Sequence, residues 1–98
     1  MKGEYLSALL KRKKEGDYIY EAGSTYNSIR KVQILFIKED VLEWSALLKY
    51  VDGNPFYAPG FWQYFETKED AVKHAIELCE DSIRRLEYEI KQLKKDMK

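Results

Sequence analysis

Residues 67–97, TKEDAVKHAIELCEDSIRRLEYEIKQLKKDM, are the most regular stretch of this 98-residue chain and contain neither proline nor glycine. Thr67 is a favoured N-cap residue, because its side-chain oxygen can accept a hydrogen bond from a free backbone N–H of the first turn. Glu69 and Asp70 follow in that turn, where carboxylates complement the positive end of the helix dipole. The sequence therefore predicts one long helix from Thr67 to about Met97.

Apolar residues recur in this helix every seven positions. Heptad position a holds Ile76, Ile83, Ile90 and Met97, and position d holds Val72, Cys79, Leu86 and Leu93. Isoleucine at a with leucine at d is typical of parallel two-stranded coiled coils. A helix of about 30 residues is roughly 45 Å long, whereas a ten-residue strand covers only about 33 Å. We therefore expect Val72, Ile76 and Cys79 to lie on a sheet and residues 82–98 to form a coiled-coil-like extension.

The apolar end of this helix needs a second surface to cover it. Our first expectation is a homodimer that self-associates through Ile83, Leu86, Ile90 and Leu93. One alternative is that an N-terminal helix of the same chain covers these residues with Leu6, Leu9 and Leu10. The other is that a different protein occupies the surface.

The residues before the long helix predict a short helix and then an antiparallel sheet of three or four strands. The short helix is expected between Gly3 and Lys14, and strands are expected at 17–21, 30–38, 41–51 and 61–65, with a loop at 56–60. The fold class is therefore α+β, in the order α-β-β-β-(β)-α. The long helix is expected to pack on one face of the sheet, with residues 1–98 in a single domain.

Alternation along the two middle strands predicts which side chains face the core. In the strand 30–38, Val32, Ile34 and Phe36 share one face, and Leu35 and Ile37 the other. In the strand 41–51, one face holds Leu42, Trp44, Ala46, Leu48 and Tyr50. Residues 39–40 are expected to form a tight turn between these strands.

Composition argues against several classes of protein. Seventeen basic and seventeen acidic residues cancel, whereas proteins that bind nucleic acid or anionic membrane usually carry a basic excess. A balanced net charge still allows a local basic patch. No segment approaches the roughly 20 apolar residues of a membrane span. The single cysteine excludes an intrachain disulfide and a cysteine-based zinc site. The polar N-terminus lacks the apolar run of a signal peptide, so a cytoplasmic protein is expected.

Residues that commonly act in catalysis or bind metals are sparse, and no catalytic, cofactor-binding or metal-binding residues are expected. His74 is the only histidine and has no second ligand in the sequence pattern, so a surface position is expected. Cys79 lies at a d position, where burial as a small core residue is expected. The five glycines are scattered rather than gathered in a phosphate-binding loop. A non-enzymatic protein is therefore predicted.

Three kinds of partner remain open. Phe56, Tyr57 and Trp62 lie in an aromatic segment broken by prolines and are candidate anchors for another protein, because aromatic rings bury a large area with few rotatable bonds. The alternative is a nucleic-acid-binding domain, and its candidate residues are Lys11, Arg12, Lys13, Lys14, Arg30 and Lys31. A small-molecule pocket between sheet and helix is the third possibility.

Three resemblances bear on these alternatives. The order helix–strand–strand–strand–helix is similar to that of double-stranded-RNA-binding domains, although Glu69 and Asp70 stand where those domains carry lysines. Residues 65–71, FETKEDA, resemble the strand-to-helix junction of arm-binding domains of tyrosine recombinases. In size and element order the chain also resembles small phage-encoded inhibitors such as anti-CRISPR proteins, which implies a small regulator that acts by covering a partner's surface.

Overall fold

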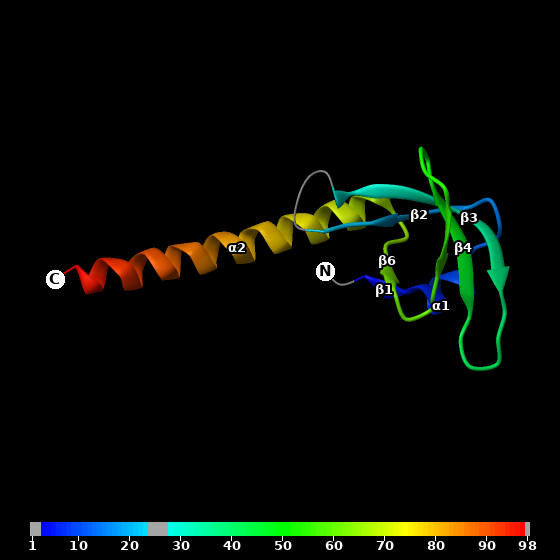
Figure 1. Cartoon of the computed structure of the whole chain (residues 1–98), viewed down its shortest axis with the longest axis horizontal. Helices are drawn as coiled ribbons and strands as arrows, with labels where there is room; N and C mark the ends of the chain where they lie inside the picture. Colours follow the sequence, from blue (N-terminus) through cyan, green and yellow to red (C-terminus); the bar gives the residue numbers. More distant parts are fainter. Residues whose placement is uncertain (1–2, 24–27, 98) are drawn as a thin grey trace.

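The computed structural model describes residues 3–23 and 28–97 and has the α+β class expected from the sequence. Its elements follow in the order β1 (Glu4–Tyr5), α1 (Leu6–Leu10), β2 (Tyr18–Glu21), β3 (Arg30–Lys38), β4 (Ser45–Tyr50), β5 (Pro55–Ala58), β6 (Gln63–Tyr64) and α2 (Lys68–Asp96). Figure 1 shows α2 projecting from the rest of the molecule. We call the part of the chain before α2 the head.

Strands β2 to β5 form one antiparallel sheet in chain order, and the short strands β1 and β6 pair with each other in a separate ribbon. A bridge between Tyr20 and Phe65 joins this ribbon to β2. The Tyr20 N–H donates to the Phe65 carbonyl at 2.8 Å, and the Phe65 N–H donates to the Tyr20 carbonyl at 2.7 Å. Because Phe65 lies just before α2, this bridge fixes the point at which α2 leaves the head.

The core lies between α1 and the inner face of the four-stranded sheet. Leu6, Leu9 and Leu10 of α1 are at most 1% exposed. They share one cluster of buried side chains with Ile19, Val32, Ile34, Ala46, Leu48, Ala58 and Tyr64. Helix α1 is shorter than the helix expected between Gly3 and Lys14, because Glu4 and Tyr5 are extended and pair with β6.

Helix α1 has five residues, too few for a stable helix by itself, and the loop before β6 holds its N-terminus. The Leu6 N–H donates to the Trp62 carbonyl at 2.7 Å, and the Ser7 N–H donates to the Gly60 carbonyl at 3.0 Å. A Cβ atom at Gly60 would lie 2.2 Å from the Trp44 carbonyl oxygen. Glycine is therefore required at position 60 for this close approach of the two backbones.

A β-bulge in β3 changes which side chains face the core. Ile34 pairs with Leu48, but Phe36 pairs with Leu47, so Leu35 is an extra residue in the ladder. Ile37 consequently packs against the core, and Phe36 is 56% exposed. The expectation that Phe36 shares the face of Val32 and Ile34 was wrong, because simple alternation assumes an unbroken ladder.

The hairpin between β3 and β4 is longer than the expected two-residue turn. Strand β4 begins only at Ser45, and Val41 and Leu42 are 99% and 95% exposed near the tip. Leu42 therefore does not share the core face of β4, contrary to expectation. The predicted loop after β4 instead contains β5, whose first residue is Pro55. A proline is tolerated at the start of an edge strand because no ladder N–H is required there.

Helix α2 begins and ends as the sequence predicts, but it packs on the head through fewer residues. The Thr67 Oγ1 accepts a hydrogen bond from the Asp70 N–H at 3.1 Å. Within α2 only Ala71 and Ala75 are buried, and they lie in the part of the helix that contacts β2. Ile76 is 50% exposed and Cys79 is exposed, so their expected burial on the sheet was wrong.

The shape of the molecule follows from this limited contact. The radius of gyration of the Cα atoms is 17.6 Å, whereas a compact chain of this length would have about 13 Å. The principal extents are 61 × 30 × 21 Å, and Figure 1 shows that α2 accounts for the long axis. Within the described ranges, neither helix combines the length and apolar character needed to span a membrane.

The two faces of β4 give a direct test of this fold. Leu48 faces the core and is 0% exposed, whereas its neighbour Leu47 faces outward and is 36% exposed. We expect Leu48→Ala to lower the free energy of unfolding by about 2–5 kcal/mol, because it leaves a cavity. Leu47→Ala is the matched control and should cost less than about 1 kcal/mol. Urea unfolding followed by circular dichroism measures both, and equal losses would contradict the assignment of faces.

Candidate functional site

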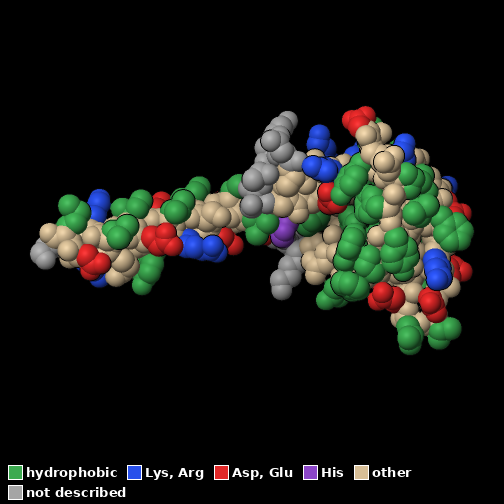
Figure 2. All heavy atoms as spheres, in the orientation of Figure 1, with side chains coloured by type: hydrophobic (Ala, Val, Ile, Leu, Met, Phe, Trp, Pro, Cys, Tyr) green, Lys and Arg blue, Asp and Glu red, His purple; other side chains and the backbone are tan. Residues whose placement is uncertain are grey.

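The first candidate surface is the a/d stripe of α2, which comprises Val72, Ile76, Cys79, Ile83, Leu86, Ile90, Leu93 and Met97. The four residues predicted to mediate self-association are between 52% and 65% exposed. Figure 2 shows hydrophobic side chains distributed along the projecting part of the helix. The structure therefore brings Ile83, Leu86, Ile90 and Leu93 together as one continuous apolar strip open to solvent.

From Ile76 onward the head does not cover this stripe, whereas Val72 is half-buried. At roughly 100° per residue, the side of α2 marked by Ala71 and Ala75 lies about a quarter turn from the stripe at the level of Ile76. The leucines Leu6, Leu9 and Leu10 are already buried in the core, so α1 is not available to fold over the helix. The alternative in which the N-terminal helix covers the stripe was therefore wrong.

The second candidate surface lies on the outer face of the sheet. Phe36 pairs with Leu47, and Leu47 pairs with Tyr57, so these three side chains form a row across β3, β4 and β5. They are 56%, 36% and 60% exposed, respectively. We call this set the outer row. Sequence reasoning missed it, because Phe36 reaches this face only through the bulge at Leu35.

The row next to the outer row contributes a basic border. Tyr18, Gln33 and Lys49 lie opposite one another on β2, β3 and β4. The Lys31 Nζ lies 4.2 Å from the centre of the Tyr18 ring, a cation–π arrangement on the same face. Neither row contains a carboxylate, so the outer face combines exposed apolar side chains with ammonium groups.

The aromatic segment does not form one surface. Phe56 and Tyr57 are neighbours on β5, so their side chains point to opposite faces of the sheet. Phe56 packs against the core and stacks on Tyr50 with 4.8 Å between ring centroids. Tyr57 joins the outer row. Trp62 is 42% exposed and lines a surface hollow with Arg30 and Tyr64.

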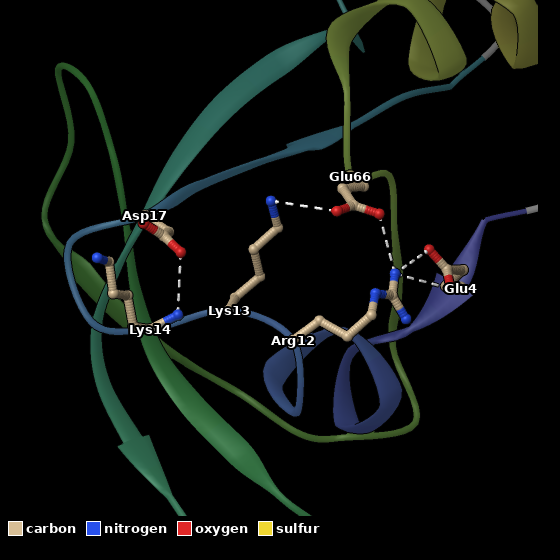
Figure 3. Close-up of polar contacts among 6 residues, drawn as sticks. All are labelled: Glu4, Arg12, Lys13, Lys14, Asp17 and Glu66. Carbon is tan, nitrogen blue, oxygen red and sulfur yellow. Dashed lines mark hydrogen bonds and ion pairs between the residues drawn. The ribbon is translucent and has the colours of Figure 1, made fainter.

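Carboxylates neutralise part of the basic N-terminal segment. One guanidinium nitrogen of Arg12, Nη2, lies 3.0 and 2.8 Å from the two carboxylate oxygens of Glu4 and 3.0 Å from Glu66 Oε2. The Lys13 Nζ lies 3.4 Å from Glu66 Oε1. Figure 3 shows these side chains converging from β1, from the turns after α1 and from the residue that precedes Thr67. These ion pairs connect Glu66, just before α2, to the segment after α1 and, through Arg12, to Glu4 of β1.

The ion pairs shift the protonation equilibria of both partners. Hydrogen bonds from Arg12, supported by Lys13, lower the pKa of the Glu66 carboxyl. Hydrogen bonds to Glu4 and then Glu66 raise the pKa of Arg12. Elsewhere, burial raises the pKa of the Tyr64 hydroxyl, and it is the main cause of the raised pKa of Tyr50, whose hydroxyl donates to Glu21 at 3.0 Å.

The two basic segments do not form a single patch. Lys11, Lys13 and Lys14 line one hollow, whereas Arg30 and Lys31 line another. The Arg30 guanidinium carbon lies 5.2 Å from the centre of the Tyr50 ring. The six candidate nucleic-acid residues are therefore divided between two places, and Arg12 and Lys13 are paired with carboxylates.

The exposure of the single histidine and the single cysteine differs from what the sequence predicted. His74 is half-buried rather than on the surface, with its ring centroid 5.0 Å from that of Phe65. Cys79 is exposed rather than buried. In the part of the chain that the structure describes, no three histidine, cysteine or carboxylate side chains gather as a metal site would require.

Comparisons with known proteins give no match: no family model, no curated protein and no solved structure is significantly similar to this chain.

The Arg12–Glu66 pair makes stability depend on pH in a defined direction. A carboxyl whose pKa is lowered on folding stabilises the fold above its unfolded pKa, and this contribution is lost as pH falls through the folded pKa. We expect Arg12→Gln to lower the Tm at pH 7, with the difference from wild type shrinking below about pH 4. Lys11→Gln is the charge-matched control. Thermal melts across this range measure it, and a difference that grew at low pH would contradict the pairing.

Proposed function

We propose that this chain is a non-enzymatic protein-binding module that self-associates through α2. The observation that carries the proposal is the exposure of the a/d stripe along a helix that the head does not cover. A continuous apolar strip on a soluble helix is the feature through which helices pair. The outer row on the sheet remains available for a second protein after α2 has paired.

The magnitude of burial supports self-association. Fully burying a leucine or isoleucine side chain contributes about 1.5–3 kcal/mol, and Ile83, Leu86, Ile90 and Leu93 are each about half exposed. Pairing two helices would therefore gain roughly 6–12 kcal/mol from these residues of both chains. Association costs at least about 4 kcal/mol. At this lowest cost the surplus is about 2–8 kcal/mol, so we expect at best a weak dimer that dissociates in the micromolar range or above.

The outer row supports the choice of a protein as the further partner. Phe36 and Tyr57 are large aromatic side chains, which are enriched at the centres of protein interfaces. The border formed by Lys31 and Lys49 complements a partner whose apolar patch is edged by carboxylates. The narrower role of an inhibitor that covers a partner's functional surface stays a prediction from the sequence.

The other candidate sites give less support to a nucleic acid or a small molecule as the partner. Arg12 and Lys13 are engaged by Glu4 and Glu66. This weakens the nucleic-acid alternative, because phosphate affinity comes from lysine and arginine side chains that neutralise phosphates and release the counterions condensed on the nucleic acid. The hollows lined by Trp62 or by the N-terminal lysines are open to solvent. Small-molecule sites are usually enclosed enough to bury most of the ligand.

Self-association is tested by the molar mass in solution, measured by light scattering from micromolar to millimolar concentrations of the protein. Ile90→Asp places a charge in the centre of the a/d stripe, so we expect a folded monomer. Tyr88→Asp is the matched control, because Tyr88 is 63% exposed on the opposite side of α2 and its substitution should leave the dimer intact. A wild type that is monomeric at every concentration, or equal effects of both variants, would refute the proposal.

The nucleic-acid alternative is tested separately by fluorescence anisotropy with labelled single-stranded and duplex oligonucleotides. We expect no saturable binding at low salt, because the chain is neutral overall and two of the six candidate cations are paired. Saturable binding that weakens steeply with added salt and is reduced by charge removal at Lys14 or Lys31 would overturn the choice of a protein partner.

A further inference from the structure

We infer that two copies of α2 pair in parallel and in register, so that Cys79 of one chain faces Cys79 of the other. The inference rests on the proposed self-association and adds the orientation of the pair. Three features of the helix lead to it: the residue types along the a/d stripe, the charges beside the stripe, and the side on which the head lies.

The core residues favour two parallel strands. Position a holds isoleucine at 76, 83 and 90, and position d holds leucine at 86 and 93. Side-chain packing at a accommodates β-branched residues in parallel dimers, and packing at d accommodates leucine. Both preferences are met in the exposed half of α2.

Charges beside the stripe favour the same orientation. In a parallel pair, each g residue faces the e residue five positions later on the other helix. Glu89 at g then faces Lys94 of the second copy at e, and symmetry forms this opposite-charge pair twice. The preceding pair is Ser82 with Glu87 of the second copy, which places no like charges together.

An antiparallel pair places like charges together. The register that matches Ile90 with Leu86 and Ile83 with Leu93 is centred near residue 88. It brings Glu87 close to Glu87 of the second copy on one flank of the stripe, and Glu89 close to Glu89 on the other. Two pairs of carboxylates therefore repel at the middle of the interface, although Glu80 gains Lys94 at each end.

The position of the head is compatible with parallel pairing. Ala71 and Ala75, which mark the side of α2 that contacts the head, lie about a quarter turn from the stripe. A two-fold axis along the paired helices therefore places the two heads on opposite sides of the coil. The first layers of the stripe, at Ile76 and Cys79, are exposed in each chain and remain accessible to the second copy.

The native cysteine reports the orientation. The two Cα atoms of a disulfide usually lie about 4.4–6.8 Å apart, and equivalent d positions of a parallel pair lie opposite each other. Diamide joins two such thiols by accepting two protons and two electrons, which reduce it to the hydrazine. We expect wild type to become a covalent dimer of doubled mass on a non-reducing gel, reversed by dithiothreitol. Neither Cys79→Ser nor the monomeric Ile90→Asp, which retains the thiol, should do so.

An antiparallel pair gives a different pattern of cross-links, because Cys79 then faces position 97 of the second copy. Wild type alone would stay uncoupled, and only its mixture with the double variant Cys79→Ser/Met97→Cys would form a disulfide between the two. That result, or the absence of any cross-link in a protein that scatters as a dimer, would overturn the parallel orientation and leave self-association standing. A wild type that scatters as a monomer would instead refute the proposed function.

Charge exchange gives a second readout without cysteine chemistry. Glu89→Lys should weaken the dimer by about tenfold, because two attractive pairs become repulsive. Adding Lys94→Glu should restore most of the affinity in a parallel pair by exchanging the two charges. In the antiparallel pair the double variant would weaken the dimer further, because Glu80 would face a new carboxylate. Failure of the double variant to recover affinity would count against parallel pairing.

Discussion

The rest of the structure depends on the packing of three leucines of α1 against the inner face of the sheet. Leu6, Leu9 and Leu10 are almost completely buried in one cluster with residues from β2 to β6. The loop at Gly60 and Trp62 can hold so short a helix in place because its carbonyls accept the first N–H groups of α1. With the inner face closed, α2 needs to contribute little more than Ala71 and Ala75 to the head.

This arrangement separates the core of the head from the exposed apolar residues of α2. The head has its own core, and the Tyr20–Phe65 bridge with the Arg12–Glu66 ion pair fixes the root of α2. The fold of the head therefore does not depend on the apolar residues from Ile83 onward. On this view the outer row and the a/d stripe are two separate surfaces, one on the sheet and one on the helix, and occupation of one leaves the other exposed.

The sequence was sufficient to predict the parts of the structure that depend on residues close together in the chain. Thr67 and the unbroken heptads were sufficient to place α2, and alternation correctly identified Ala46 and Leu48 as core residues. Phe36 was assigned to the wrong face because a bulge depends on pairing with β4, which the sequence of β3 does not display. Leu42 was assigned to the core because an apolar residue in a hairpin tip looks the same as one in a strand. The outer row could not be predicted, since it joins residues from three strands whose register is set by the whole sheet.

The exposure of the second half of α2 has a consequence for how its helical content depends on protein concentration. Beyond Ala75 no residue of the helix is buried, so this part of α2 lacks the tertiary packing that supplies most of the stability of helices in proteins. In a lone chain we therefore expect the amide hydrogens of this segment to exchange with solvent through local opening rather than through global unfolding. In the proposed dimer a second copy would supply the missing contacts, so helix formation there and dimer formation would be one coupled equilibrium. The helical content of this protein should therefore rise with its concentration while the head remains unchanged.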